Sequence, residues 1–324
     1  MNTIQLNTTG LLPSLGSLRR LCRVAAIATM IACGLVSAAT AQQSFKTPGE
    51  AVDALVAAAR ASDKKAFNAL LGPGAEQIAS SGDAVEDENT RKLFVAAFDA
   101  KHSTKIDGDK SATLIVGDDD FPFPIPLVKK DGAWTFDTAA GREEILARRI
   151  GRNELAAIQV CLAFYDAQND YADITPKADG MAVYAQKIVS SPGKKDGLYW
   201  PAASGEQESP IGEEVATATR RGYRVGSGEP FHGYYYRILT RQGPAAPGGA
   251  LNYVVDGKMV GGFALVAWPA EYGNSGITTF IINHDGVVYE KDLGEDTKDT
   301  ASRMTSFNPD NTWKKVEVEI EEKK

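Results

Sequence analysis

The chain has 324 residues, of which 43 % are hydrophobic, so it can form a sizeable core, and its length suggests two domains. Its formal net charge is −7 at pH 7. This acidic balance lacks the basic footprint of a nucleic-acid-binding protein.

The first 41 residues have the pattern of an export signal. Arginines precede an apolar run of about 13 residues, Val24 to Val36, which is shorter than the roughly 20 residues of a membrane-spanning helix. Ala39-Thr40-Ala41 then fits the small-x-small rule for cleavage after Ala41. We expect a protein of the periplasm or cell envelope without a transmembrane helix in the mature chain. The alternative is a lipoprotein anchored at Cys33.

Cleavage after Ala41 removes three arginines and no acid, so the net charge changes from −7 to −10. It also leaves Cys161 as the single cysteine, which cannot form an internal disulfide. Because Cys161 lies in an apolar helical pattern, we expect a buried, inert thiol rather than a nucleophile.

Helix signals open the mature region. Thr47, Pro48 and Glu50 form a capping box for a first helix, and Ser62-Asp63 begins a second helix that Gly72-Pro73-Gly74 stops. A third helix is predicted from Asn89 to Lys101, with Leu93, Phe94, Ala97 and Phe98 facing inward. Strands follow at Ala112–Val116, Phe123–Val128 and Ala133–Phe136. Helices followed by an antiparallel meander predict an α+β domain over residues 45–140.

The longest helical pattern runs from Gly141 to about Tyr171. Its predicted apolar stripe consists of Leu155, Ile158, Leu162 and Tyr165, widened by Ala157, Cys161 and Phe164. Such a broad face needs a large surface to cover it. We expect it to pack on a C-terminal antiparallel sheet, so that residues 141–310 form a second domain before a charged tail, 311–324.

Two hairpins are predicted in that C-terminal sheet. Asp256-Gly257 separates Tyr253–Val255 from Met259–Val260, and His284-Asp285-Gly286 separates Ile277–Ile282 from Val287–Tyr289. The segment between the long helix and this sheet, Thr175–Arg221, is irregular apart from Val183–Val189 and a short helix after Ser209-Pro210.

Four long segments resemble a family of exported bacterial proteins, the domain of unknown function numbered 2950. They are TPGEAVDALVAAARASD from Thr47, FPFPIPLVKKDGAWTFDTAAGREEILARRIGRNELAAIQVCLAFYDAQNDYA from Phe121, FHGYYYRILTRQGPAAPGGA from Phe231 and MVGGFALVAWPAEYGNSGITTFIINHDGVVYEKDLG from Met259. The resemblance implies export, but no activity, cofactor or catalytic residue.

Two weaker likenesses concern shape. The helix 153–171 and the strands after it look like the globular part of a pilin, although the helix begins with charged residues where a pilin has an apolar half. Residues 47–137 look like the cone-shaped domain of the nuclear transport factor 2 type. Neither likeness gives a function.

Aromatic and loop residues are the candidates for binding a ligand or partner. His232 precedes three tyrosines and an arginine that could line a pocket, although alternating tyrosines also suit a half-exposed strand. The loop Pro269–Gly276 adds two further residues. The candidate set is His232, Tyr234, Tyr235, Tyr236, Arg237, Tyr272 and Asn274.

Acidic clusters are the candidates for metal binding. Asp118, Asp119 and Asp120 could hold Ca²⁺, although they lack EF-hand spacing and also suit a solvated loop. Asp166, Asp170 and Asp173 share one face of the long helix, which also suits a solvated face. We expect no resident cofactor, with Ca²⁺ as the alternative.

Catalytic motifs are scarce. His284-Asp285 could be half of a hydrolytic dyad, but no Gly-x-Ser-x-Gly elbow accompanies it, and a hairpin turn explains both residues. We therefore predict a non-enzymatic envelope protein that binds another envelope protein or a small ligand. A metal-dependent or hydrolytic envelope enzyme is the alternative.

Overall fold

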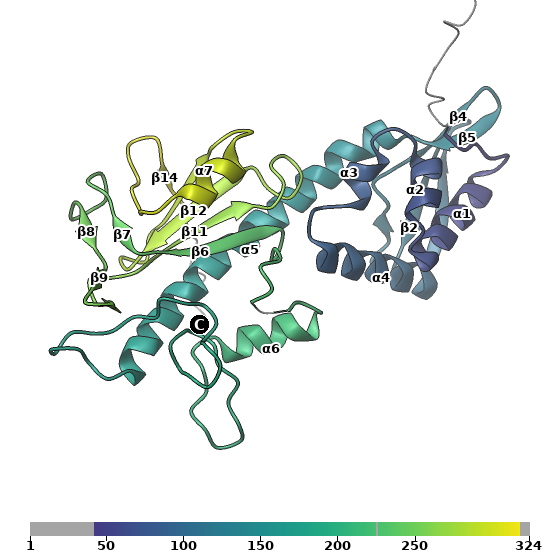
Figure 1. The fold of residues 1–324 in the computed structure, drawn as a ribbon. Helices are drawn as coiled ribbons and strands as arrows, with labels where there is room; N and C mark the ends of the chain where they lie inside the picture. The colour runs from purple at the N-terminus through teal and green to yellow at the C-terminus, as the bar shows by residue number, and fades with distance from the viewer. Residues whose placement is uncertain (1–41, 225, 318–324) are drawn as a thin grey trace, which may run out of the picture. The chain divides into compact units, whose positions relative to one another are not determined.

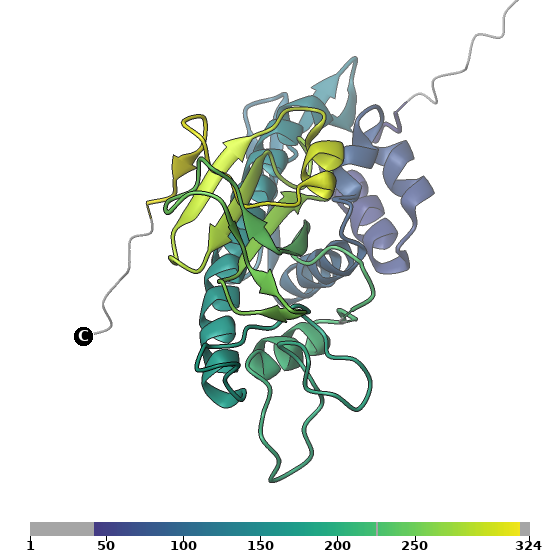
Figure 2. The ribbon, with the colours of Figure 1, turned by 60° about the vertical axis from the view of Figure 1, so that its left-hand side comes forward.

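The computed structural model describes residues 42–224 and 226–317, which fold into helices and antiparallel sheets (Figures 1 and 2). The predicted α+β class is therefore confirmed. The helices of these residues are α1 (Pro48–Ala61), α2 (Lys64–Leu71), α3 (Ala75–Ala79), α4 (Ala84–Ala100), α5 (Thr138–Ile174), α6 (Gly212–Arg220) and α7 (Thr297–Arg303).

Side-chain caps determine where the first helices begin. The hydroxyl of Thr47 accepts a hydrogen bond from the backbone N–H of Glu50 at 3.2 Å, so the predicted cap of α1 is confirmed. The carboxylate of Asp63 caps α2 in the same way. Helix α4 begins before its predicted start at Asn89, because Asp83 accepts from the first amides of this helix.

The first sheet has the strand order β1-β2-β4-β5, with β3 paired to β2. Two prolines, Pro124 and Pro126, lack the N–H that a strand ladder needs, so the predicted strand Phe123–Val128 is wrong in its extent. Helices α1, α2 and α4 pack on this sheet and form the first core. The strands are β1 (His102–Asp107), β2 (Ser111–Val116), β3 (Phe121–Pro122), β4 (Leu127–Lys130) and β5 (Ala133–Phe136).

Helix α5 follows the first sheet and reaches the second. Near its start it lies against the loop before β4, because a Cβ atom on Gly141 would lie 2.7 Å from Ile125 Cα. Only glycine permits this approach. Further along, α5 packs on the second sheet, as predicted.

The second sheet has the order β14-β13-β12-β11-β6, and all its neighbouring strands are antiparallel. Helix α5 covers one face and α7 contacts β11 on the other (Figure 1). All six residues of β11 are buried, which explains its uninterrupted apolar sequence. The strands are β6 (Tyr234–Leu239), β11 (Ala264–Pro269), β12 (Thr278–Asn283), β13 (Val288–Asp292) and β14 (Lys314–Lys315).

Both predicted hairpins are confirmed. Strands β12 and β13 form one of them, and the short strands β9 (Val254–Val255) and β10 (Lys258–Met259) form the other. Asp256 and Gly257 both have positive φ, at 48° and 75°, as the tight turn requires. A further short ladder joins β7 (Arg241–Gln242) to β8 (Leu251–Asn252).

The predicted inward faces of two helices are partly wrong. Leu93 on α4 is 70 % exposed and Leu155 on α5 is 67 % exposed. The prediction is confirmed for Ala157, Cys161 and Phe164, which are buried and lie on the inward face of α5. The small side chains of Ala157 and Cys161 let the helix approach the sheet closely. Ile158, Leu162 and Tyr165 lie at the edge of that face, partly buried.

Several predictions concern parts of the chain that the structure does not test. The export signal, its cleavage site after Ala41 and the alternative anchor at Cys33 lie outside the described residues, as does the end of the charged tail, 318–324. The division into domains near residue 140 stays a prediction. Within the part that the structure describes, no helix has both the length and the apolar character to cross a membrane.

Candidate functional site

A cavity of about 780 Å³ lies between the N-terminal helices, the first sheet and the first half of α5. Its volume falls in the range of about 300–1,000 Å³ that is typical of small-molecule sites. The lining is mainly apolar and includes Leu55, Phe67, Phe94, Phe123, Ile125 and Ile145. The cavity can therefore hold a ligand with a substantial apolar part.

Hydrophobic side chains continue to the open side of this cavity. Leu93 of α4 and Phe121 of β3 both line it, although they are 70 % and 48 % exposed. The guanidinium of Arg148 lies over the ring of Phe121, 5.1 Å from its centroid. Deeper in, the rings of Phe94 and Phe123 pack with centroids 5.3 Å apart. The cavity thus combines aromatic walls with a cationic edge.

A buried arginine, Arg149, lines the cavity. The guanidinium of Arg149 donates hydrogen bonds to the backbone oxygens of Gln77, Ile78 and Ser80 at the end of α3, and to Oδ1 of Asn274. Burial lowers the pKa of Arg149. All four acceptors are neutral, while the nearby carboxylates of Asp87 and Glu271 favour the charged form of the guanidinium. Arg149 thus brings a buried positive charge to this wall of the cavity.

The segment that begins α4 is tied to the C-terminal half of the chain by a buried carboxylate. Asp83 is 2 % exposed, and its Oδ2 accepts hydrogen bonds from the hydroxyl of Tyr223 at 2.9 Å and the backbone N–H of Gly233 at 3.0 Å. A Cβ atom at position 233 would lie 2.5 Å from the side-chain nitrogen of Asn153. Glycine is therefore required at this junction.

His232 belongs to this junction and does not line the cavity. Its ring packs on Phe231 with centroids 4.2 Å apart, and its φ is +51°. Burial, and then the positive charge of Arg221, lowers the pKa of His232. Arg221 in turn forms an ion pair with Glu86 of α4 at 2.8 Å.

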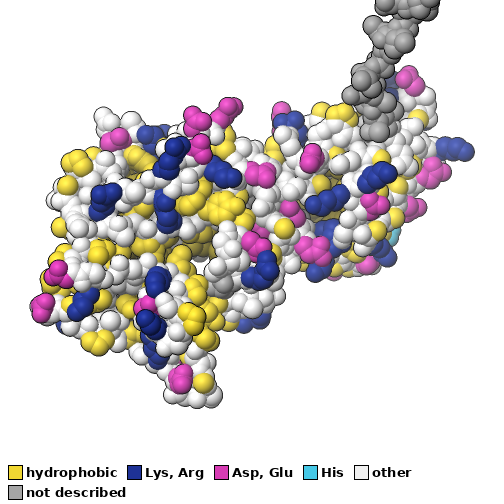
Figure 3. Space-filling view, viewed as in Figure 1, with side chains coloured by type: hydrophobic (Ala, Val, Ile, Leu, Met, Phe, Trp, Pro, Cys, Tyr) yellow, Lys and Arg dark blue, Asp and Glu magenta, His cyan; other side chains and the backbone are white. Residues whose placement is uncertain are grey.

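The four predicted residues after His232 lie on β6 and make internal contacts. Tyr234 is fully buried, and its hydroxyl donates to the backbone oxygen of Thr278. Tyr235 packs on Trp268, and Tyr236 donates to the oxygen of Phe231. Around β6, hydrophobic side chains also come to the molecular surface (Figure 3).

Arg237 caps the C-terminus of helix α7 and does not line the cavity. Its guanidinium donates to the backbone oxygens of Ala301, Ser302 and Met304, which are the terminal carbonyl groups of α7. It also lies 5.9 Å from the ring centroid of Trp268. These contacts give Arg237 a structural task.

The two loop residues of the candidate set are separated from each other. Asn274 contacts Arg149 and donates to the oxygen of Ser80 at 2.9 Å, so it joins the 269–276 loop to the wall of the cavity. Tyr272 instead donates to Asp292 of β13 at 3.3 Å. Of the seven predicted residues, only Asn274 touches the cavity wall.

The predicted acidic cluster lies on an exposed turn. Asp118, Asp119 and Asp120 are all exposed, and Asp120 forms an ion pair with Lys101 at 2.7 Å. Among residues 42–224 and 226–317, no three His, Cys, Asp or Glu side chains converge as a metal site would require. A Ca²⁺ site here stays a prediction without support from the geometry. The helical acids Asp166, Asp170 and Asp173 are exposed as well.

The possible hydrolytic dyad has aromatic neighbours. His284 Nε2 lies 4.0 Å from Asp285 Oδ1, which exceeds hydrogen-bond distance, and its ring packs edge-on against Tyr253 and Phe263.

Cys161 is fully buried, as predicted, and burial raises the pKa of its thiol to about 12. A thiol in that environment is inert.

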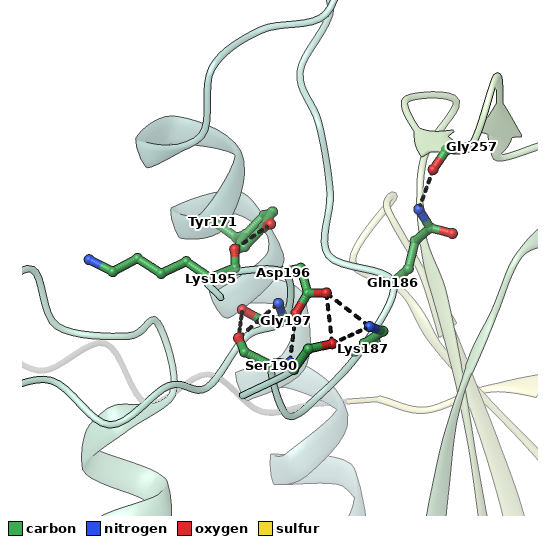
Figure 4. Close-up of polar contacts among 9 residues, drawn as sticks. Tyr171, Gln186, Lys187, Ser190, Lys195, Asp196, Gly197 and Gly257 are labelled. Carbon is green, nitrogen blue, oxygen red and sulfur yellow. Dashed lines mark hydrogen bonds and ion pairs between the residues drawn. The ribbon is translucent and has the colours of Figure 1, made fainter. Parts of the chain in front are cut away.

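In the loop between α5 and α6, Lys187 contacts both a serine and an aspartate (Figure 4). These contacts lie within the loop and stabilise it. Lys187 Nζ lies 2.7 Å from Ser191 Oγ and 2.9 Å from Asp196 Oδ2. The hydrogen bond from Lys187, together with those from Ser191, lowers the pKa of Asp196 well below its usual range. Lys187 therefore forms an ion pair with Asp196 and a hydrogen bond with Ser191, and both contacts lie within one loop.

Further contacts tie the same loop to its surroundings. The hydroxyl of Tyr171 on α5 donates to the oxygen of Lys195 at 3.0 Å, and Gln186 donates to the oxygen of Gly257 at 2.8 Å (Figure 4). The loop is thereby joined to α5 and to the β9–β10 turn. These contacts have a structural role, because they hold the loop against its neighbours.

The fold and the cavity together define an α+β protein with a ligand-sized, mainly apolar cavity in its N-terminal core. The family model described as "Protein of unknown function (DUF2950)" matches residues 42–316, so the chain belongs to this family, as its sequence resemblance indicated. No curated protein and no solved structure matches the chain significantly.

Proposed function

We propose that this protein is a non-enzymatic binding protein of the cell envelope, which holds a small, largely apolar ligand in the N-terminal cavity. One observation carries the proposal. The cavity of about 780 Å³ is lined by Phe94, Phe123 and Ile145, which are only partly buried. An apolar ligand would complete their burial, at a gain of about 25 cal/mol per Å² of apolar surface removed from water.

The open side of the cavity supports the same function. Leu93 and Phe121 line it and are 70 % and 48 % exposed, and exposed apolar side chains that border a cavity are common at ligand sites. The proposed location rests on the signal pattern of the first 41 residues. Cell fractionation, with the mass of the mature chain, distinguishes cleavage after Ala41 from lipid attachment at Cys33.

Binding is tested with N-phenyl-1-naphthylamine, a neutral apolar dye whose fluorescence increases in apolar surroundings. Ala97 lines the cavity from α4, so Ala97→Phe fills the space, and we expect at least a tenfold loss of dye affinity. The matched control is Ala96→Phe, because Ala96 is exposed on the same helix and does not line the cavity. Equal affinity of both variants would refute binding in this cavity.

A further inference from the structure

The charged residues of the cavity indicate what kind of ligand it accepts. Three of its four acidic side chains have partners. Glu86 pairs with Arg221, Glu88 pairs with Arg91, and both carboxylate oxygens of Asp87 accept from the backbone N–H of Ser81. The fourth, Asp119, lies on the exposed turn. Glu86 and Glu88 thus have cationic partners of their own, whereas Asp87 has only a neutral one and offsets part of the charge of Arg149 on α5.

The cationic wall consists of three arginines on α5 that all line the cavity: Arg148, Arg149 and Arg152. Arg148 pairs with Glu144 at 2.7 Å. Arg149 is 9 % exposed, and in the described chain it bonds only to neutral acceptors. Asp87 and Glu271 lie near enough to favour its charged form, whereas the positive charge of Arg152 opposes it. A buried charge acts strongly on its surroundings, because little water screens it.

Arg152 follows Arg149 by about one helical turn. Its side chain is exposed, and with residues 42–224 and 226–317 it forms neither an ion pair nor a hydrogen bond. A guanidinium can bind a carboxylate through two parallel hydrogen bonds. Arg152 can thus contact an anionic group at the edge of the cavity, beside the field of Arg149.

We propose that the ligand is an amphipathic carboxylate with a single apolar chain. Its chain lies among Phe94, Phe123 and Ile125, and its carboxylate binds Arg152 beside Arg149. The cavity volume suits one such molecule rather than a membrane surface. This inference rests on the proposed function, since it specifies the ligand of the same cavity.

Competition for the bound dye tests the ligand class with two probes of equal chain length, dodecanoate and 1-dodecanol. We expect dodecanoate to displace the dye from the wild-type protein at about one-tenth of the dodecanol concentration. Arg152→Gln should reduce that preference to about twofold or less, and added salt should weaken dodecanoate binding. The matched control is Arg142→Gln, which removes an exposed arginine of α5 that does not line the cavity.

The possible outcomes distinguish a failure of the carboxylate inference from a failure of the proposed binding function. If the dye binds the wild-type protein but Ala97→Phe does not weaken it, the proposed function fails. If both probes displace the dye equally, the cavity binds a neutral ligand and only the inference fails. A tenfold preference that survives in Arg152→Gln would also overturn the assignment of the carboxylate to Arg152.

Discussion

The two cores of this chain both combine helices with an antiparallel sheet, but they are filled to different extents. In the C-terminal core, Phe263 and Phe280 are at most 1 % exposed, and Phe263 contacts the rings of Phe164 and Tyr184. In the N-terminal core, Phe94 and Phe123 remain partly buried around a cavity. Interiors normally pack closely, so the N-terminal core with its cavity is the one in which we propose that a ligand binds.

The largest effect should come from removing an aromatic side chain of the filled core. Phe263→Ala should lower the free energy of unfolding by about 3–5 kcal/mol, because it leaves a cavity among packed rings. Phe123→Ala should cost less than about 2 kcal/mol, because that ring already borders an open space. Urea unfolding measures both values, and equal losses would contradict the contrast between the cores.

The junction between the two cores should be the next most sensitive place. Asp83→Ala removes the N-cap of α4 and the acceptor for Tyr223 and Gly233. Buried donors left without an acceptor cost about 1–3 kcal/mol each, so we expect a loss near 3 kcal/mol in urea unfolding. Tyr223→Phe removes one hydrogen bond and should cost about 1 kcal/mol. Similar losses in both variants would mean that the other Asp83 contacts contribute little.

Enlarging a small side chain should distinguish the cores in the opposite direction. Ala157 is fully buried where α5 meets the second sheet, so Ala157→Leu should cost about 1–3 kcal/mol through overpacking. Ala97→Leu extends into the cavity and should change stability by less than about 1 kcal/mol. Thermal unfolding of the two variants provides the comparison, and a large loss for Ala97→Leu would show that the cavity is not free space.

Much of the fold follows from local signals in the sequence. Thr47 and Asp63 cap helices where their patterns predict, and Asp256-Gly257 forms the expected turn. The errors arise where tertiary packing overrides the pattern. Leu155 continues the predicted apolar stripe but is exposed, whereas Ala157 and Cys161, which were predicted only to widen the stripe, are the residues through which α5 packs on its sheet.

The candidate site was harder to predict than the fold. Clustered tyrosines and acids attract attention in a sequence, yet Tyr234 and Arg237 satisfy internal carbonyl groups. The cavity depends on how the helices and strands pack in three dimensions, and no sequence motif predicts where such packing leaves a cavity. One signal was available, since Arg148, Arg149 and Arg152 give the first half of a long helix a basic face that the predicted core did not use.

The smallest predicted effect concerns pH at the junction between the cores. Burial and Arg221 lower the pKa of His232, whereas Glu86 and Asp83 oppose that shift. The unfolded chain therefore binds a proton at higher pH than the folded chain does, and stability falls as pH decreases from 7 through the usual histidine range near 6.5. His232→Asn does not titrate there, and asparagine tolerates the positive φ. Between pH 7 and pH 5, the urea midpoint of the wild type should fall further than that of the variant, and parallel profiles would assign the pH dependence to other groups.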